Sequence, residues 1–394
     1  MKYDFTSIIS RANTGSEKWE QMKGWNPNIS EDTVPFSVAD MEFKNPPEII
    51  EGLKNYLDSV ILGYTGPTEN YYKAVCSWMK ERHAWNIKPE WIVGSAGVVS
   101  AFFSAIKALT KPGDGIVVMS PVYYPFYMAI EKNDRKVVKS QLTNNGKTYE
   151  IDFEDLEKKT QDPSNKILLF CSPHNPVGRV WTTEELERVG EICLRNKVLI
   201  ISDEIHFDII MPGYKHTVFA SLSEELANNM IVCTAPSKTF NLAGLQTSNI
   251  IIPNEKIRDA YRKEVESNGF FSLNIFGYKA CEIAYTQCEN WLEELIEIVH
   301  HNHLELKKYI EENIPAIKVF ELQGTYLQWM DFNKLGLDKD ELEKLMHESE
   351  LFFDEGYIFG EEGIGFERMN LACPTSVLMK ALERLKNAID KMIM

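Results

Sequence analysis

Short runs of apolar residues alternate with segments of helical spacing through the middle of the chain. Between the runs, residues 98–108 and 183–194 repeat apolar positions with the period of a helix, and Thr182 or Thr183 is a candidate N-cap. Strands that are apolar throughout and alternate with helices predict an α/β fold, in which helices cover both faces of a mostly parallel sheet. The runs that predict these strands lie at residues 91–93, 115–119, 166–171, 197–201, 230–234 and 248–252.

The two ends of the chain depart from this alternation. Residues 34–43 read as an extended arm or strand, and two helices are predicted at 48–62 and 71–83. Beyond residue 252 the pattern is mostly helical as far as 303, and it includes a candidate long connecting helix at 291–300. A smaller α+β domain is predicted after it, with strands at 317–322, 326–332 and 366–371 and helices near 339–349 and at the C-terminus. We therefore expect an N-terminal arm (1–45) that joins the small domain, a large domain (46–285) and a small C-terminal domain (286–394).

Composition and charge exclude several classes of partner. The chain has 394 residues, 44% hydrophobic and 25% charged, which is ordinary for a globular protein. A formal net charge of −16 argues against nucleic acid or an anionic membrane as the main partner. No run of 18 apolar residues and no signal peptide is visible, so we expect a cytoplasmic protein with no membrane-spanning helix.

Cysteine and histidine usage gives no indication of a metal centre. The seven cysteines are odd in number, mostly within apolar runs, and no pair has C-x-x-C spacing, so they are expected to be reduced core residues. His300, His301 and His303 lie in a helical stretch without an acidic or cysteine partner at suitable spacing. We expect them on a solvated helix face, and no metal site.

Polar residues follow the predicted strands where each strand ends. Gly97, Tyr123, Asn175, Asp203 and Lys238 all come shortly after an apolar run. In open α/β sheets the carboxyl ends of the strands form the ligand-binding edge. We therefore expect these residues to meet at one site.

Each of these residues alone carries little information, but their chemistry is complementary. Desolvation at a strand end favours the neutral amine of Lys238, which can attack a carbonyl, although a lone lysine there more commonly just ends a strand. The buried carboxylate of Asp203 needs a cationic partner. Gly97 and Val98 precede a helix and offer N–H groups to a phosphate. With the aromatic ring of Tyr123 and the amide of Asn175, the set describes a pyridoxal 5′-phosphate (PLP) site.

The chain resembles the fold-type-I PLP enzymes over essentially its whole length. The resemblance rests on the motifs Ser-Ala-Gly (95–97), Pro-Val-Tyr (121–123), His-Asn-Pro-Val-Gly (174–178), Ser-Asp-Glu (202–204) and Ser-Lys-Thr (237–239). It implies a three-layer large domain that binds the cofactor. Within the family, Val-Ala-Asp-Met-Glu-Phe (38–43), Asp-Glu-Ile-His (203–206) and Ala-Pro-Ser-Lys-Thr-Phe-Asn (235–241) are similar to the cystathionine β-lyase, or C–S lyase, branch.

The resemblance also implies a role for each matching residue. Lys238 would bind the cofactor as a Schiff base and then act as the base, and Asp203 would pair with the pyridine nitrogen. Asn175 would bond the ring hydroxyl, and Tyr123 would stack on the ring. The amides of Gly97 and Val98, together with Ser237, would hold the phosphate.

Further positions are implied to contact the substrate or the neighbouring subunit. Arg368 would grip the substrate α-carboxylate as a bidentate pair, and Ala39 is a candidate substrate contact. Tyr64 would reach the phosphate of the neighbouring subunit, which implies a homodimer with shared sites. Two positions depart from the aminotransferase pattern: Gln246 replaces a phosphate-binding arginine, and His206 replaces a tyrosine that bonds the ring oxygen.

These features favour α,β-elimination on cystathionine or a related cysteine S-conjugate. The products would be a thiol (homocysteine from cystathionine), pyruvate and ammonia. The alternative is an aminotransferase of class I/II, which shares the early steps but needs a keto-acid acceptor. A third possibility is a non-catalytic regulator that keeps the fold, against which the presence of Lys238 and Arg368 argues.

Overall fold

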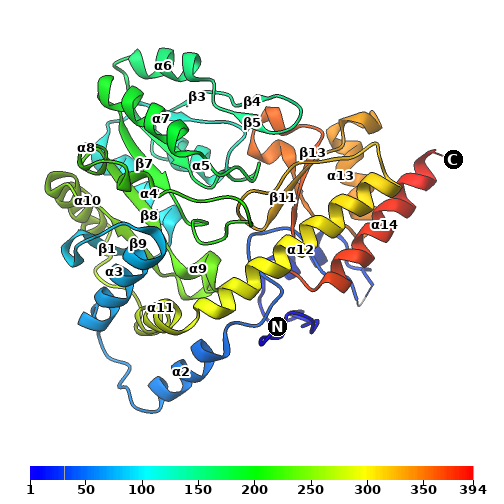
Figure 1. Ribbon diagram of the computed structural model, residues 1–394, viewed down its shortest axis with the longest axis horizontal. Coiled ribbons are helices and arrows are strands. Elements are labelled where there is room, and N and C mark those ends of the chain that lie inside the picture. Colours follow the sequence, from blue (N-terminus) through cyan, green and yellow to red (C-terminus); the bar gives the residue numbers. More distant parts are fainter. Residues whose placement is uncertain (31, 394) are drawn as a thin grey trace.

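A seven-stranded mixed sheet forms the centre of the larger part of the molecule (Figure 1). The computed structural model describes residues 1–30 and 32–393. The strand order is β1-β9-β8-β7-β6-β2-β3, and the strands from β8 to β3 are parallel, whereas β9 is antiparallel to both of its neighbours. The mostly parallel sheet is as predicted. Its strands are β1 (Ile92–Ser95), β2 (Gly115–Val118), β3 (Lys136–Lys139), β6 (Asn165–Cys171), β7 (Leu199–Asp203), β8 (Met230–Thr234) and β9 (Ser248–Ile251).

Side chains of this sheet alternate between two hydrophobic cores. On β8, Ile231 and Cys233 belong to one core, and Met230 and Val232 belong to the other. The first core also contains α4 (Val98–Leu109), α5 (Pro125–Glu131) and α10 (Glu255–Ser267). The second is covered by α3 (Glu69–His83), α6 (Phe153–Gln161), α7 (Thr183–Arg195) and α11 (Ile275–Gln287). Because both faces are buried, the strands need to be apolar throughout, which explains their continuous pattern.

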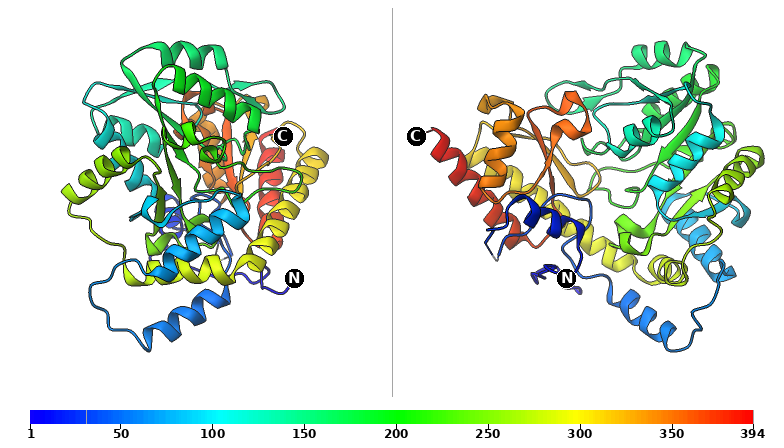
Figure 2. Two further views of the ribbon diagram at one scale, coloured as in Figure 1. Left: turned by 60° about the vertical axis from the view of Figure 1, so that its left-hand side comes forward. Right: turned by 180° about the vertical axis from the view of Figure 1, so that it is seen from behind.

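A second, four-stranded antiparallel sheet forms the smaller part, in the order β10-β11-β13-β12. Its strands are β10 (Lys318–Val319), β11 (Leu327–Asp331), β12 (Asp354–Glu355) and β13 (Phe366–Asn370). The helix α12 (Glu289–Asn313) runs from the larger part to the smaller one, beside α14 (Thr375–Ile393) (Figures 1 and 2). The helix α13 (Lys339–Glu348) lies at the outer side of this sheet.

The N-terminal arm packs against the smaller part. It contains α1 (Glu17–Trp25), and residues 34–43 form no strand, with bends at 38–39 and 42–43 and a φ of +51° at Val38. The Phe36 N–H donates to the Phe352 carbonyl at 2.9 Å, and the Phe36 carbonyl accepts from the Asn370 N–H at 2.9 Å. The arm then leads to α2 (Pro47–Leu57), which projects from the body of the molecule (Figure 2).

The long helices and strands lie where the sequence predicts them, but several of their ends differ from the prediction. The capping box of α7 has Thr182 as its N-cap and Glu185 at N3, one of the two alternatives that the sequence left open. The predicted helix at 48–62 ends already at Leu57. The helical region from 255 to 303 is divided into α10, α11 and α12, with breaks at residues 268–274 and 288. Short elements went unpredicted: α1, α5, α6, α8 (Glu224–Ala227), α9 (Pro236–Thr239), β3, and the hairpin of β4 (Thr143–Asn144) and β5 (Tyr149–Glu150).

Two further predictions from the sequence concern α11 and α12. The predicted domain boundary between residues 285 and 286 falls inside the last turn of α11, and the division into domains stays a prediction. The expectation that His303 is solvated is wrong: it is fully buried, and its Nδ1 lies 2.7 Å from Gln328 Oε1 on β11. Among the helices of residues 1–30 and 32–393, none is long and apolar enough to cross a membrane.

Candidate active site

A cavity of about 280 Å³ lies at the carboxyl edge of the parallel strands. Most of the residues that the sequence singled out line it: Ala39, Gly97, Val98, Tyr123, Asn175, Asp203, His206, Ser237 and Lys238. Arg368 reaches this edge from the smaller sheet and contacts Asn175. Tyr64 is separate from it, because its side chain is fully exposed in the segment after α2. The structure therefore brings together residues that are up to 329 positions apart in the sequence.

Lys238 enters the cavity from the short helix α9, directly after β8. Its Nζ donates to the carbonyl oxygen of Ala39 at 2.6 Å. Burial lowers the pKa of Lys238 from 10.5 to about 8, while the nearby carboxylate of Asp40 opposes the shift. A substantial fraction of this amine is therefore neutral, and so nucleophilic, at mildly alkaline pH.

Asp203 ends β7 on the floor of the same cavity. Burial raises the pKa of Asp203 to about 7, because little compensates the lost hydration of its carboxylate. The Ile205 N–H donates to Oδ1 at 3.2 Å, and no other hydrogen bond or ion pair reaches this carboxyl group from the described residues. The group is therefore poised to accept a cationic partner from within the cavity.

His206 lies near Asp203 and is equally enclosed. Burial lowers the pKa of His206 well below 6.5, with Lys238 and Arg368 acting in the same direction, so the ring is neutral at physiological pH. Its Nδ1 is buried and has no hydrogen-bond partner within the part of the chain that the structure describes. Its ring packs edge-on against Tyr326, with the centroids 5.7 Å apart.

The N-terminus of α4 forms one wall of the cavity. Gly97 is the N-cap, with φ +138°, a conformation that L side chains rarely adopt. Residues 97–100 line the cavity, and the first backbone N–H groups of a helix have no acceptor within it. The helix dipole and these N–H groups favour an anion. Gln246, with φ +46°, also lines the cavity. It holds the position at which the aminotransferase pattern has an arginine.

Arg368 on β13 is oriented by two partners. Its Nη1 donates to Asn175 Oδ1 at 2.8 Å, and its Nε donates to Asp354 Oδ2 at 3.1 Å, an oxygen that Nη2 also contacts. Asp354, on the neighbouring strand β12, thus occupies the side-on edge of the guanidinium. Nη1 and Nη2 each keep one further N–H that a second carboxylate can accept.

Asn175 and Tyr123 are held against each other by the backbone. The Tyr123 N–H donates to the Asn175 carbonyl at 3.1 Å. Because Arg368 uses the side-chain oxygen of Asn175, the amide NH₂ group points away from the guanidinium and remains a donor. Burial raises the pKa of the Tyr123 phenol, which keeps its ring neutral.

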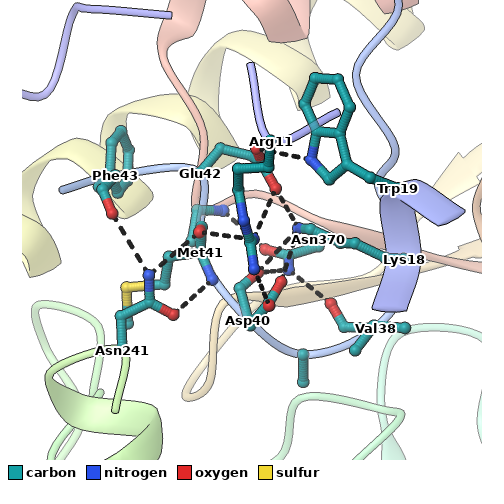
Figure 3. Close-up of polar contacts among 12 residues, drawn as sticks. Arg11, Lys18, Trp19, Val38, Asp40, Met41, Glu42, Phe43, Asn241 and Asn370 are labelled. Atoms are coloured by element: carbon teal, nitrogen blue, oxygen red, sulfur yellow. Dashed lines mark hydrogen bonds and ion pairs between the residues drawn. The ribbon is translucent and has the colours of Figure 1, made fainter. Parts of the chain in front are cut away.

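The arm reaches the cavity through Ala39, and a cluster of charges fixes it there (Figure 3). Lys18 is only 1% exposed, and its Nζ lies 3.0 Å from Asp40 Oδ1 and 2.6 Å from Glu42 Oε1. Arg11 contacts the same two carboxylates, at 2.8 and 3.3 Å. The Ala39 carbonyl, which holds Lys238, also accepts from the Tyr326 hydroxyl at 2.8 Å. The arm therefore sets the position of the acceptor that orients the amine.

Sequence reasoning did not find Asp354, Tyr326 or the partners of Asp40. Asp354 lies in a two-residue strand that has no periodic signal, and Tyr326 reads as an ordinary strand residue. Lys18 and Arg11 lie in a polar segment whose charges look like those of a solvated surface. Only the strand pairing of β12 with β13 and the path of the arm bring these groups to the site.

Comparison with known proteins identifies the family. The model of the aminotransferase class I and II family matches residues 31–385. The chain belongs to this family. It is 42% identical over 388 residues to the cystathionine beta-lyase PatB of Bacillus subtilis, covering 98% of this chain and 100% of that protein.

Solved structures agree with the observed fold. The structure of cystalysin from Treponema denticola, which contains a PLP cofactor, matches with a TM-score of 0.98 and 53% identity over 100% of both chains. A PLP-bound C–S lyase from Staphylococcus hominis matches with a TM-score of 0.91 and 32% identity, again over 100% of both. A probable aspartate/prephenate aminotransferase of Aquifex aeolicus is more distant, at 25% identity over 375 residues. The predicted fold type I and the resemblance to the C–S lyase branch are thereby confirmed.

Proposed function

We propose that this protein is a PLP-dependent carbon–sulfur lyase of the cystathionine β-lyase type. Its reaction is the α,β-elimination of cystathionine or a related cysteine S-conjugate. The Cα–H and Cβ–S bonds break, the sulfur leaves as a thiol, and the remaining fragment takes up water to give pyruvate and ammonia. The observation that carries the proposal is the buried Lys238 amine, which shares one cavity with the unpaired carboxyl group of Asp203.

The residues of the cavity fit this cofactor. Asp203 has room for a cationic ring nitrogen, and the N-terminus of α4 with Ser237 offers donors to a phosphate. The unpartnered Nδ1 of His206 and the free amide hydrogens of Asn175 suit the polar substituents of the ring. When bound, PLP accepts the electron pair left at the substrate α-carbon after its proton is removed.

The roles of the protein groups follow from their positions. Arg368 binds the substrate α-carboxylate end-on, because its side-on edge is occupied by Asp354. Lys238 holds the cofactor and, once released from it, removes the α-proton. The carbonyl of Ala39 then supports the released amine, as it does at 2.6 Å in this structure. Tyr123, which lines the cavity, would stack on the cofactor ring.

The names of the similar proteins and the identity of two residues in the cavity favour elimination over transamination. Curated relatives named cystathionine beta-lyase are 42% and 30% identical to this chain, whereas the curated aminotransferases are at 25% and 24%. A PLP-bound structure described as a putative aminotransferase from Clostridium difficile is at 43%. Gln246 and the neutral His206 stand where aminotransferases carry a cationic and a phenolic group. The proton therefore is not expected to return to the cofactor, and no keto acid is required.

The test is to incubate the purified holoenzyme with cystathionine, cysteine and S-methylcysteine, with and without 2-oxoglutarate. We expect pyruvate and thiol to appear in equal amounts without the keto acid, and glutamate to be absent when it is added. Lys238→Ala is the matched inactive control. Products that form only in the presence of 2-oxoglutarate would instead establish the aminotransferase alternative.

We further propose a homodimer, supported by the exposed apolar residues after α2. Ile61 is 88% exposed and Tyr64 is fully exposed, which is costly for a free surface. In a dimer, Tyr64 would contribute to the site of the neighbouring subunit. Sedimentation should give twice the chain mass of 45.3 kDa, and Tyr64→Phe should weaken cofactor retention without changing the mass. Location in the cytoplasm remains a prediction from the sequence.

A further inference from the structure

A second cluster of ionisable groups lies on the face of the small sheet opposite to Arg368. Glu343 and His347 are four residues apart on α13, so they project from the same side of that helix. Glu355 comes from β12, and its Oε1 lies 3.4 Å from His347 Nε2. One ligand atom from each of the three groups lies within 4.8 Å of the other two. A single ion placed among them would contact all three.

Glu367 is a further carboxyl group beside this cluster, outside the three groups whose ligand atoms lie within 4.8 Å of one another. It is directly opposite Glu355 in the pairing of β12 with β13, so both side chains project from one face of the sheet. Glu367 is only 2% exposed, and no hydrogen bond or ion pair reaches its side chain from the described residues. A buried carboxyl group without a donor is costly unless a cation or a proton satisfies it.

No lysine or arginine of the described residues neutralises the cluster by direct contact. Across residues 1–30 and 32–393, none forms an ion pair with Glu343, Glu355 or Glu367, and Lys339 instead lies over the Tyr357 ring, 5.4 Å from its centroid. The Tyr357 hydroxyl donates to Glu343 Oε2 at 2.9 Å and so fixes that carboxylate. Trp25 stacks on the His347 ring at 4.9 Å, which holds Nε2 toward the carboxylates.

We propose that Glu343, His347 and Glu355, beside the buried carboxyl group of Glu367, form a binding site for a divalent transition-metal ion, with Zn²⁺ as the best match. One imidazole nitrogen with carboxylate oxygens is a ligand set that Zn²⁺ accepts, whereas Ca²⁺ and Mg²⁺ prefer oxygen alone. The i, i+4 pair on a helix is a common way to supply two ligands to one ion. The Tyr357 hydroxyl is the outer partner that orients Glu343.

The site would join α13 to β12, which carries Asp354 and pairs with the strand of Arg368. Asp354 and Arg368 project from the opposite face of β12 and β13, one residue before Glu355 and one after Glu367. The ion would therefore act as a structural clamp behind the substrate-binding arginine. The sequence indicated no metal site, because the helix pair and the two strand residues have no recognisable spacing until the sheet brings them together.

The test measures Zn²⁺ binding to the holoenzyme after dialysis against EDTA, with a competing chromophoric chelator. His347→Gln/Glu355→Gln removes two ligands, and His301→Gln, an exposed histidine on α12, is the matched control. We expect the wild type and the control to bind one equivalent more than the double variant. Single replacement of Glu343, which is only partly buried, should weaken the affinity by about tenfold or more. Zn²⁺ at a hundredfold excess over its Kd should raise the midpoint of thermal unfolding by about 3 °C in the wild type and the control, but not in the double variant.

The variant Glu367→Gln distinguishes a bound metal ion from a proton shared among the carboxyl groups. If a proton satisfies the carboxyl groups, this variant is more stable than the wild type, and added Zn²⁺ changes neither protein. If the ion is bound, Glu367→Gln is still stabilised by Zn²⁺, but less than the wild type, because a neighbouring negative charge has been removed. Equal Zn²⁺ binding by the wild type and the double variant, or no binding at 1 mM Zn²⁺, would overturn the proposal.

Discussion

Replacing Lys18 by methionine would remove a buried ammonium group from the charge cluster that fixes the arm. Methionine preserves the length and the apolar stem, so the loss is mainly that of charge. In the variant, Arg11 alone would face the carboxylates of Asp40 and Glu42, leaving one buried negative charge in excess. Lys18 and Arg11 together hold the pKa of Asp40 below 3.8, against the opposing effect of burial, so this carboxylate is ionised at neutral pH.

The size of the effect follows from the geometry. Breaking a buried pair costs about 3–5 kcal/mol, and we expect about 3 kcal/mol because Arg11 still contacts both acids. The entropy of unfolding is about 2.1 cal/mol/K per residue, or about 0.8 kcal/mol/K for 394 residues. The midpoint of thermal unfolding should therefore fall by about 4 °C. Turnover should fall by about tenfold as well, because the Ala39 carbonyl that orients Lys238 precedes Asp40.

Two further variants make the reasoning testable by differential scanning calorimetry. Arg11→Met should cost only about 1 kcal/mol, because its side chain is 28% exposed and Lys18 would remain. Lys18→Met/Glu42→Gln restores the charge balance, leaving Arg11 with Asp40, and should recover part of the lost stability. An excess of buried negative charge is excluded as the cause if Lys18→Met loses no more stability than Arg11→Met, or if the double variant is less stable than Lys18→Met.

Three other predictions concern the site itself. Asp354→Asn should raise the KM for the amino-acid substrate by about tenfold with little change in kcat, since it loosens Arg368 without removing it; a fall in kcat alone would contradict this. The pKa of Lys238 is about 8, below its ordinary 10.5, so the neutral amine becomes abundant as the pH rises through 8. Capture of added PLP by the apoenzyme, followed by absorbance, should accelerate up to that pH and then level off; a rate that is independent of pH between 6 and 9 would be inconsistent with this. The pKa of Asp203 is raised from 3.8 to about 7, so its burial destabilises the apoenzyme increasingly from about pH 4 to 7. Asp203→Asn should therefore unfold at a higher temperature than the wild-type apoenzyme at pH 8, but not at pH 4, and should lose activity; equal gains at both pH values would exclude the carboxylate as the cause.

The sequence predicted the floor of the site because topology alone places it. The strands ending at Cys171, Asp203 and Thr234 are continuous apolar runs, and residues that follow parallel strands must share one edge. Asn175, Asp203 and Lys238 are therefore brought together by the sheet order, without any knowledge of side-chain contacts.

The contacts that orient these residues were beyond the sequence. Successive side chains of β13 project from opposite faces of the small sheet, so Arg368 faces the large sheet and Glu367 faces away from it. A shift of the strand by one residue would exchange the two. The pairing with the two-residue strand β12 that supplies Asp354 has no sequence pattern. Likewise, a buried Lys18 cannot be told from a solvated lysine until the arm is seen to fold over it.

The state of Lys238 shows how these separate parts act on one atom. Burial near the end of β8 has the largest effect and lowers the pKa of Lys238. The carboxylate of Asp40 on the arm raises this pKa, and the guanidinium of Arg368 on the small sheet lowers it. No single element accounts for a value near 8, which lies close enough to neutrality for the amine to serve both as nucleophile and as base. The arm, the large sheet and the small sheet must all be in place for this balance. A lysine that ends a strand becomes a reactive amine because three distant segments of the chain converge on it.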